Sequence, residues 1–117
     1  MERIGFGDEA KRAKTRTKYL RTPVTLVVGC APHENEMLHD ENRDAVSAGI
    51  QNLLLGATAL GLASFWSTPA LTQPPRVLEL CGFEPDDRIV GIIYLGWAER
   101  TCAAPERPPV DVTVIDR

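Results

Sequence analysis

The sequence lacks the local motifs on which many sites built from protein side chains depend. It contains no G-x-S-x-G elbow, no glycine-rich phosphate loop and no H-E-x-x-H metal motif. It also offers no nucleophile beside a candidate base, so we predict no catalytic side chain of its own. Any catalysis by this chain would therefore rest on a bound cofactor that the protein holds and orients.

Cysteine is scarce, and long apolar runs are missing. The three cysteines, Cys30, Cys81 and Cys102, are an odd number at wide spacing, and neither a signal peptide nor a stretch long enough to cross a membrane is found. We expect a reduced, cytoplasmic protein with no membrane contact. Cys30, His33 and His39 form a loose cluster without a fourth ligand, and we interpret them as loop residues without a metal.

The formal net charge of −3 is unevenly distributed along the chain. The first 21 residues hold seven basic and three acidic side chains, a net of +4, so the remainder carries −7. A basic arm on an acidic body would suit nucleic acid, but Phe6 and Tyr19 are its only stacking candidates and no known module is present. We predict a solvated face and no nucleic-acid partner.

The length of 117 residues, with 44% hydrophobic and 25% charged residues, is typical of one soluble folded domain. We therefore treat residues 1–117 as a single domain. Its opening segment, Asp8 to Leu20, has almost no apolar stripe and predicts a weak helix or a lead-in.

A long apolar helix is predicted from an N-cap at Asp40 to a stop at Gly61. Its apolar residues recur at spacings of three and four, namely Val46, Ile50, Leu53, Leu54, Ala57 and Leu60. Further apolar positions widen this stripe, which predicts a central helix packed on more than one side. Its small residues would allow close approach of another backbone, either within the core or across a dimer interface.

Extended segments and one short helix account for most of the remaining chain. The pattern predicts strands at Val24–Gly29, Ala63–Trp66, Ile89–Leu95 and Val110–Ile115, the last needing a sheet edge from its own chain or a partner. Cys30 to His39 is predicted to be a loop, and a short helix capped by Thr72 is predicted from Pro74-Pro75 to Gly82.

Two stretches carry a family resemblance. The run QNLLLGATALGLASFW and the following STPALTQPPRVLELCGFEPDDRIVGIIYLGW closely resemble the C-terminal half of the FMN-dependent nitroreductase family, in its small single-domain branch. The resemblance extends from about Lys11 to Arg107. The implied fold is α+β, a nitroreductase-like fragment in which the central buried helix packs on a small mixed sheet.

The resemblance implies a cofactor site at particular positions. In the family, the segment after the central helix runs along the flavin ring with its backbone amides near the redox-active edge, and here that segment is Trp66, Ser67, Thr68 and Pro69. Arg107 begins an R-P-P sequence similar to an element whose arginine meets the FMN phosphate, a role that suits a guanidinium. A core aromatic at Trp66 and a plain surface arginine at position 107 are the alternatives.

The resemblance also implies an activity and an assembly. Family members pass hydride from NAD(P)H to FMN and then to nitroaromatic, quinone-like or other small acceptors at one shared site, in ping-pong fashion. They are generally homodimers with FMN at the interface, packed central helices and terminal segments that cross to the partner.

Two departures from the family pattern define a rival hypothesis. The family opens with an R-R-S type segment that binds the FMN phosphate, and this chain begins after it; we therefore expect the N-terminal part of the fold to be missing. Pro69 stands where many members have glycine, which removes a backbone N–H. The rival is a truncated, catalytically inactive dimerisation or flavin-binding module.

Overall fold

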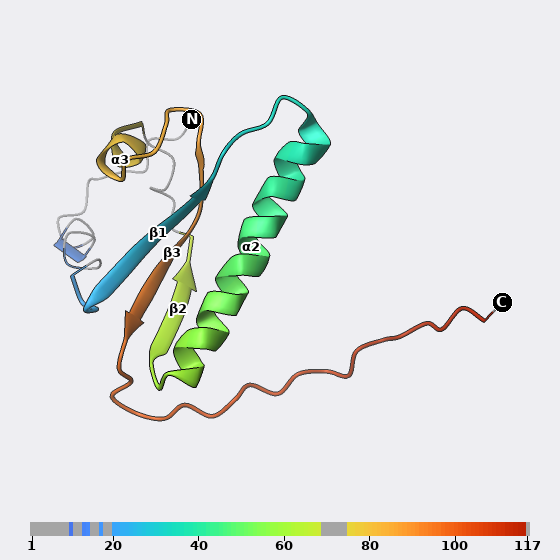
Figure 1. The fold of residues 1–117 in the computed structure, drawn as a ribbon. Coiled ribbons are helices and arrows are strands. Elements are labelled where there is room, and N and C mark those ends of the chain that lie inside the picture. Colours follow the sequence, from blue (N-terminus) through green and yellow to red (C-terminus); the bar gives the residue numbers. More distant parts are fainter. Residues whose placement is uncertain (1–9, 11–12, 15–16, 18–19, 69–74, 117) are drawn as a thin grey trace.

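The computed structural model describes residues 10, 13–14, 17, 20–68 and 75–116. Its elements, in order, are β1 (Val24–Cys30), α2 (Glu36–Ala59), β2 (Ala63–Ser67), α3 (Pro75–Leu80) and β3 (Arg88–Gly96). In the opening segment, the described residues 10, 13, 14 and 17 are helical. One long helix lies along a small sheet, and α3 sits at the end of the sheet away from the start of the C-terminal tail (Figure 1).

The described strands form a three-stranded sheet in the order β1-β3-β2. The predicted apolar strand, β3, lies at its centre and is buried on both faces: the successive residues Ile92 and Ile93 are 4% and 0% exposed. Both pairings are antiparallel, so the expected mixed sheet is wrong. The reason is topological. β1 and β2, which α2 connects, point in the same direction but do not pair with each other, because β3 lies between them and runs antiparallel to both.

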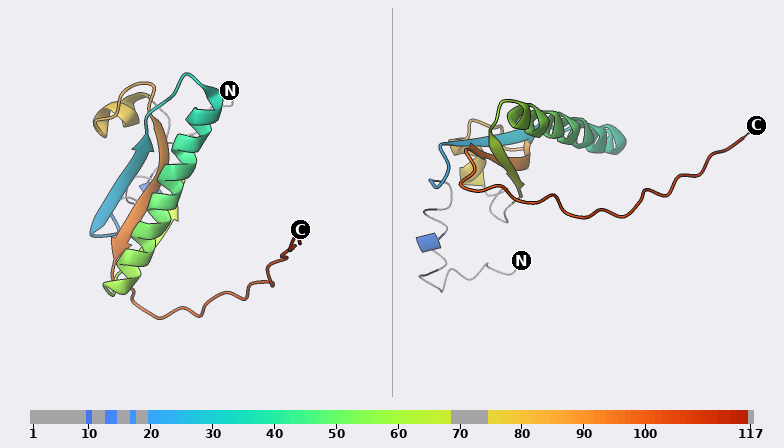
Figure 2. Two further views of the ribbon diagram at one scale, coloured as in Figure 1. Left: turned by 45° about the vertical axis from the view of Figure 1, so that its right-hand side comes forward. Right: turned by 90° about the horizontal axis from the view of Figure 1, so that it is seen from below.

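α2 covers one face of the sheet and contacts all three strands. Its buried residues are Ile50 and Ala57, and Ile50 belongs to the core cluster with Val90 and Ile93 of β3. Figure 2 shows the helix lying along one face of the sheet. On the other side Leu55 is 60% exposed, and a Cβ built on Gly49 or Gly56 would meet nothing among the described residues. The expected burial on more than one side is therefore wrong for the single chain, which supplies only one packing layer.

The start of α2 differs from the prediction. Asn35, not Asp40, is the N-cap, and its side-chain oxygen accepts hydrogen bonds from the backbone N–H groups of Met37 (3.0 Å) and Leu38 (3.2 Å). The first turn therefore occupies part of the predicted loop. Because this turn is mostly exposed to solvent, it needs no apolar periodicity, which is the pattern that predicts the rest of the helix.

The end of α2 matches the prediction. Gly61 has a positive φ of 79°, its N–H donates to Thr58 O (3.0 Å), and the N–H of Leu62 donates to Ala57 O (2.9 Å). These two bonds form a Schellman motif that satisfies carbonyls at the helix terminus. α3 ends at Gly82 in the same manner, whereas its predicted cap, Thr72, lies outside the described residues.

The C-terminal tail is not a strand. Residues 97–116 have no regular secondary structure and run away from the sheet in every view (Figures 1 and 2). Within one chain the predicted strand Val110–Ile115 is therefore wrong, and pairing with a partner's sheet edge stays a prediction. None of the described sheet edges pairs with the tail, and the valines and isoleucine of the predicted strand are more than three-quarters exposed, as for Val112 (76%) and Ile115 (86%).

Candidate functional site

The candidate site is the end of β2 and the residues that follow it. β2 forms an edge of the described sheet, with Trp66 opposite Ile93 and Ser67 opposite Ile92 on β3. Successive side chains of a strand point to opposite faces. An edge strand also directs one row of backbone N–H and C=O groups away from its neighbour, so β2 presents polar groups outward.

Trp66 packs into the core on the α2 side of the sheet. It is half-buried and lies against the cluster that contains Ile50, Val90 and Ile93. Its indole lies over Gly91, where a Cβ would come within 2.7 Å of the indole Cδ1 atom. The side chain therefore acts as a core aromatic, and the backbone of the segment is what remains available for a ligand.

The neighbours of Trp66 in β2 belong to the other face. Phe65 stacks on Tyr94 of β3 with ring centroids 6.5 Å apart and an interplanar angle of 29°. Ser67 is half-buried, and Thr68 just beyond the strand is exposed. Two hydroxyl groups thus lie where the strand ends, whereas Pro69 lies outside the described residues.

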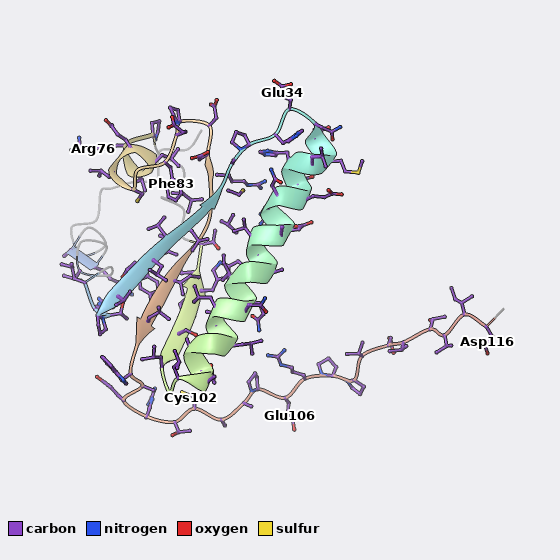
Figure 3. The ribbon with its side chains drawn as sticks, in the orientation of Figure 1. Glu34, Arg76, Phe83, Cys102, Glu106 and Asp116 are labelled. Carbon is purple, nitrogen blue, oxygen red and sulfur yellow. The ribbon has the colours of Figure 1, made fainter. Side chains whose placement is uncertain are left out.

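Arg107 is not brought to this segment within one chain. It is exposed and lies in the tail beside Glu106, which Figure 3 places beyond the end of α2 and away from the sheet. The tail leaves the body from the end of β3, next to the start of β2 and not next to Ser67. The chain alone therefore joins Trp66, Ser67 and Thr68 but leaves Arg107 apart.

The residues that sequence reasoning missed are Gly91 and the Phe65–Tyr94 pair. A glycine inside an apolar strand is a known signal for close approach of another group, so Gly91 within IVGIIYL was detectable. The aromatic pair was not, because the register between β2 and β3 cannot be read from either segment alone.

The histidines near the start of α2 organise the local backbone. The Nδ1 atom of His33 accepts a hydrogen bond from the N–H of Asn35 (3.0 Å), and that of His39 accepts one from the N–H of His33 (3.2 Å). In the described part of the chain, no group of three or more His, Cys, Asp or Glu side chains is placed to hold a metal ion. Among the same residues, no helix has both the length and the apolarity that crossing a bilayer requires.

An antiparallel α+β core, with a long helix on one sheet face and a polar strand end beside it, defines the class of this chain. The family model for the nitroreductase family matches residues 5–97. The chain belongs to the nitroreductase family, as the resemblance of its central stretches predicted.

Individual relatives agree with this assignment. The chain is 30% identical over 95 residues to YdjA of Escherichia coli, which is described as a candidate NAD(P)H nitroreductase, and 29% identical over 90 residues to YfhC of Bacillus subtilis, described likewise. These matches cover 80% and 77% of this chain but 52% and 46% of the relatives. The chain thus spans about half the length of the curated relatives it matches.

A solved structure extends the likeness to the fold. The crystal structure of a nitroreductase-like family protein from Bacillus cereus matches with a TM-score of 0.76 and 30% sequence identity. The match covers 87% of this chain and 57% of that chain.

Proposed function

We propose that this chain is part of an FMN-dependent NAD(P)H oxidoreductase that reduces nitroaromatic or quinone-like acceptors by a ping-pong route. The observation that carries the proposal is the polar end of β2, which is an edge strand of the sheet. Trp66 of this strand packs against the core, and residues 5–97 of the chain match the nitroreductase family. Such a segment offers a fixed backbone beside exposed polar groups.

The donor set at this strand end fits the polar edge of a flavin. The hydroxyls of Ser67 and Thr68 and the outward amides of β2 can hydrogen-bond ring oxygens and nitrogens, and the guanidinium of Arg107 suits a phosphate. FMN, when bound, supplies the hydride chemistry that the side chains lack. The protein's part is to bind the ring, orient its reactive edge and limit access of water.

The proposal includes a homodimer. The outer side of α2 displays Leu55 at 60% exposure between small residues, and the tail carries exposed valines and no pairing partner among the described strands. Both features favour a second copy that covers the helix and receives the tail. Arg107 would then reach a flavin at the partner's strand end.

We further place the activity in the cytoplasm. The three cysteines are free, and two of them, Cys81 and Cys102, are exposed. Exposed unpaired thiols are typical of a reducing compartment.

The test is a titration of the purified 117-residue chain with FMN, followed by protein and flavin fluorescence, and then by NADH and NADPH oxidation with a nitroaromatic acceptor. We expect saturable binding with one FMN per chain and a rise in thermal stability with excess FMN. A colourless protein whose melting temperature does not rise with excess FMN would contradict the proposal and favour the truncated, catalytically inactive module.

Arg107 can be tested in the same titration. Arg107→Ala should raise the FMN Kd by about tenfold or more, because a hydrogen bond to a charged group is worth roughly 1.5–3 kcal/mol. Arg100→Ala removes another exposed arginine just after β3 and should leave Kd unchanged. Equal effects of both substitutions would indicate a general charge effect and no phosphate contact.

A further inference from the structure

The contact between Trp66 and Gly91 fixes the end of β2 to the centre of the sheet. Trp66 is opposite Ile93 in the register, yet its indole reaches over Gly91, two residues along β3. Such a diagonal contact is within reach of an aromatic side chain. It places the largest side chain of β2 directly before Ser67 and Thr68.

Among the described residues, packing and not hydrogen bonding holds this indole in place. The Nε1 atom is buried, and it has no hydrogen-bond partner among the described residues. A Cβ on Gly91 would lie 2.7 Å from Cδ1 and 3.2 Å from Cε2 of the ring, and closer still to Nε1. The absence of a side chain at position 91 is therefore a condition for the position of the ring.

We infer that Gly91 is a positioning residue for the cofactor: it seats the indole of Trp66 and thereby sets where Ser67 and Thr68 meet the flavin. The inference rests on the proposed function. A methyl group at position 91 must displace the ring, since the colliding atoms belong to a rigid indole. Ser67 is the next residue in the chain, so the strand end shifts with the ring.

The first variant is Gly91→Ala, measured as the FMN Kd in the full chain. We expect Kd to rise by about tenfold or more, together with a changed visible circular-dichroism spectrum of the bound flavin. The melting temperature of the protein without FMN is recorded for every variant, because a changed core also lowers stability.

The rescue is the double variant Gly91→Ala with Trp66→Phe. Phenylalanine removes ring atoms from the space above Gly91 while the alanine methyl refills part of it, so the pair changes core volume little. We expect the FMN Kd of the double variant to lie within about twofold of the FMN Kd of Trp66→Phe alone. This comparison remains available if Gly91→Ala alone does not fold.

Gly29→Ala is the matched control. Gly29 is also a strand glycine under close contact, since a Cβ there would lie 2.8 Å from Phe83 Cε1 and 3.0 Å from Arg88 O. It lies on β1, which β3 separates from β2. We expect Gly29→Ala to lower the melting temperature and to leave the FMN Kd unchanged.

The outcomes separate this inference from the proposed function. If the wild-type chain does not bind FMN, the proposed function fails and the inference fails with it. If the wild type binds FMN while Gly91→Ala lowers only the melting temperature, the inference alone is overturned. It is also overturned if the methyl weakens FMN binding equally in the wild-type and Trp66→Phe backgrounds, or if Gly29→Ala raises Kd as much as Gly91→Ala.

Discussion

At the scale of single residues, glycine determines where the chain turns and where it packs closely. Gly61 provides a left-handed residue at the end of α2, whereas Gly91 provides space for an aromatic ring. The helix stop at Gly61 can be predicted from the sequence, because a periodic apolar stretch ends at this glycine. For the second role, a glycine inside an apolar strand indicates only that some group approaches closely, and the fold is needed to identify that group as Trp66.

Replacing Gly61 tests the first role. Gly61→Ala should lower the free energy of unfolding by about 1 to 2 kcal/mol, because a Cβ is disfavoured in the left-handed region, and among the described residues a Cβ there meets no atom that would add a clash. Gly61→Asn should cost less, since asparagine tolerates this conformation better. Urea denaturation of both variants gives the comparison, and an equal loss in the two would contradict the conformational explanation.

At the scale of elements, the sequence predicts those parts whose burial leaves a periodic pattern. β1, β2, β3, the body and end of α2, and α3 all follow from apolar runs and glycine stops, and each is present. The start of α2 was misplaced because an exposed first turn has no such pattern. In the tail, alternating valines indicate a strand only where an edge is available, and none of the described strands of the same chain offers one.

The candidate site shows the same limit. The sequence singled out Trp66, Ser67 and Thr68 through family resemblance, and the fold joins them at one strand end. Their contact with a flavin stays a prediction. A core aromatic at Trp66 was one of the two alternatives left open by the sequence, and the fold selects it, because the choice depends on the register that sets Trp66 near Gly91.

The corrected helix start leads to a prediction for α2. Asn35→Ala should lower the free energy of unfolding by about 1 kcal/mol, because two backbone N–H groups lose their acceptor. Asn35→Asp, which keeps a capping oxygen, should retain most of the stability. Asp40→Ala serves as control: it removes the cap predicted from sequence, which lies inside the helix, and denaturation should reveal a change below about 0.5 kcal/mol. A larger loss for Asp40→Ala than for Asn35→Ala would contradict this assignment.

At the scale of the whole molecule, one chain leaves two surfaces without cover among its described residues. The outer side of α2 is exposed along most of its length, and the tail extends away from the body, so the molecule measures 60 × 45 × 28 Å. A second copy would cover the helix and accept the tail. The same copy would bring Arg107 to a strand end that the Arg107 of its own chain does not reach.

A lysine on the outer side of α2 tests this arrangement. Leu55→Lys should raise the dimer dissociation constant by at least about tenfold, because it removes the burial of a leucine, worth roughly 1.5–3 kcal/mol, and forces a charge into the contact. FMN binding should weaken with it, since Arg107 would no longer reach the partner's site. Glu79→Lys, at an exposed position of α3 away from the outer side of α2, should change neither quantity. Sedimentation velocity gives the dimer fraction and FMN titration gives the affinity. A wild-type chain that remains monomeric at all concentrations, yet binds FMN tightly, would contradict the dimer and require each chain to build the site alone.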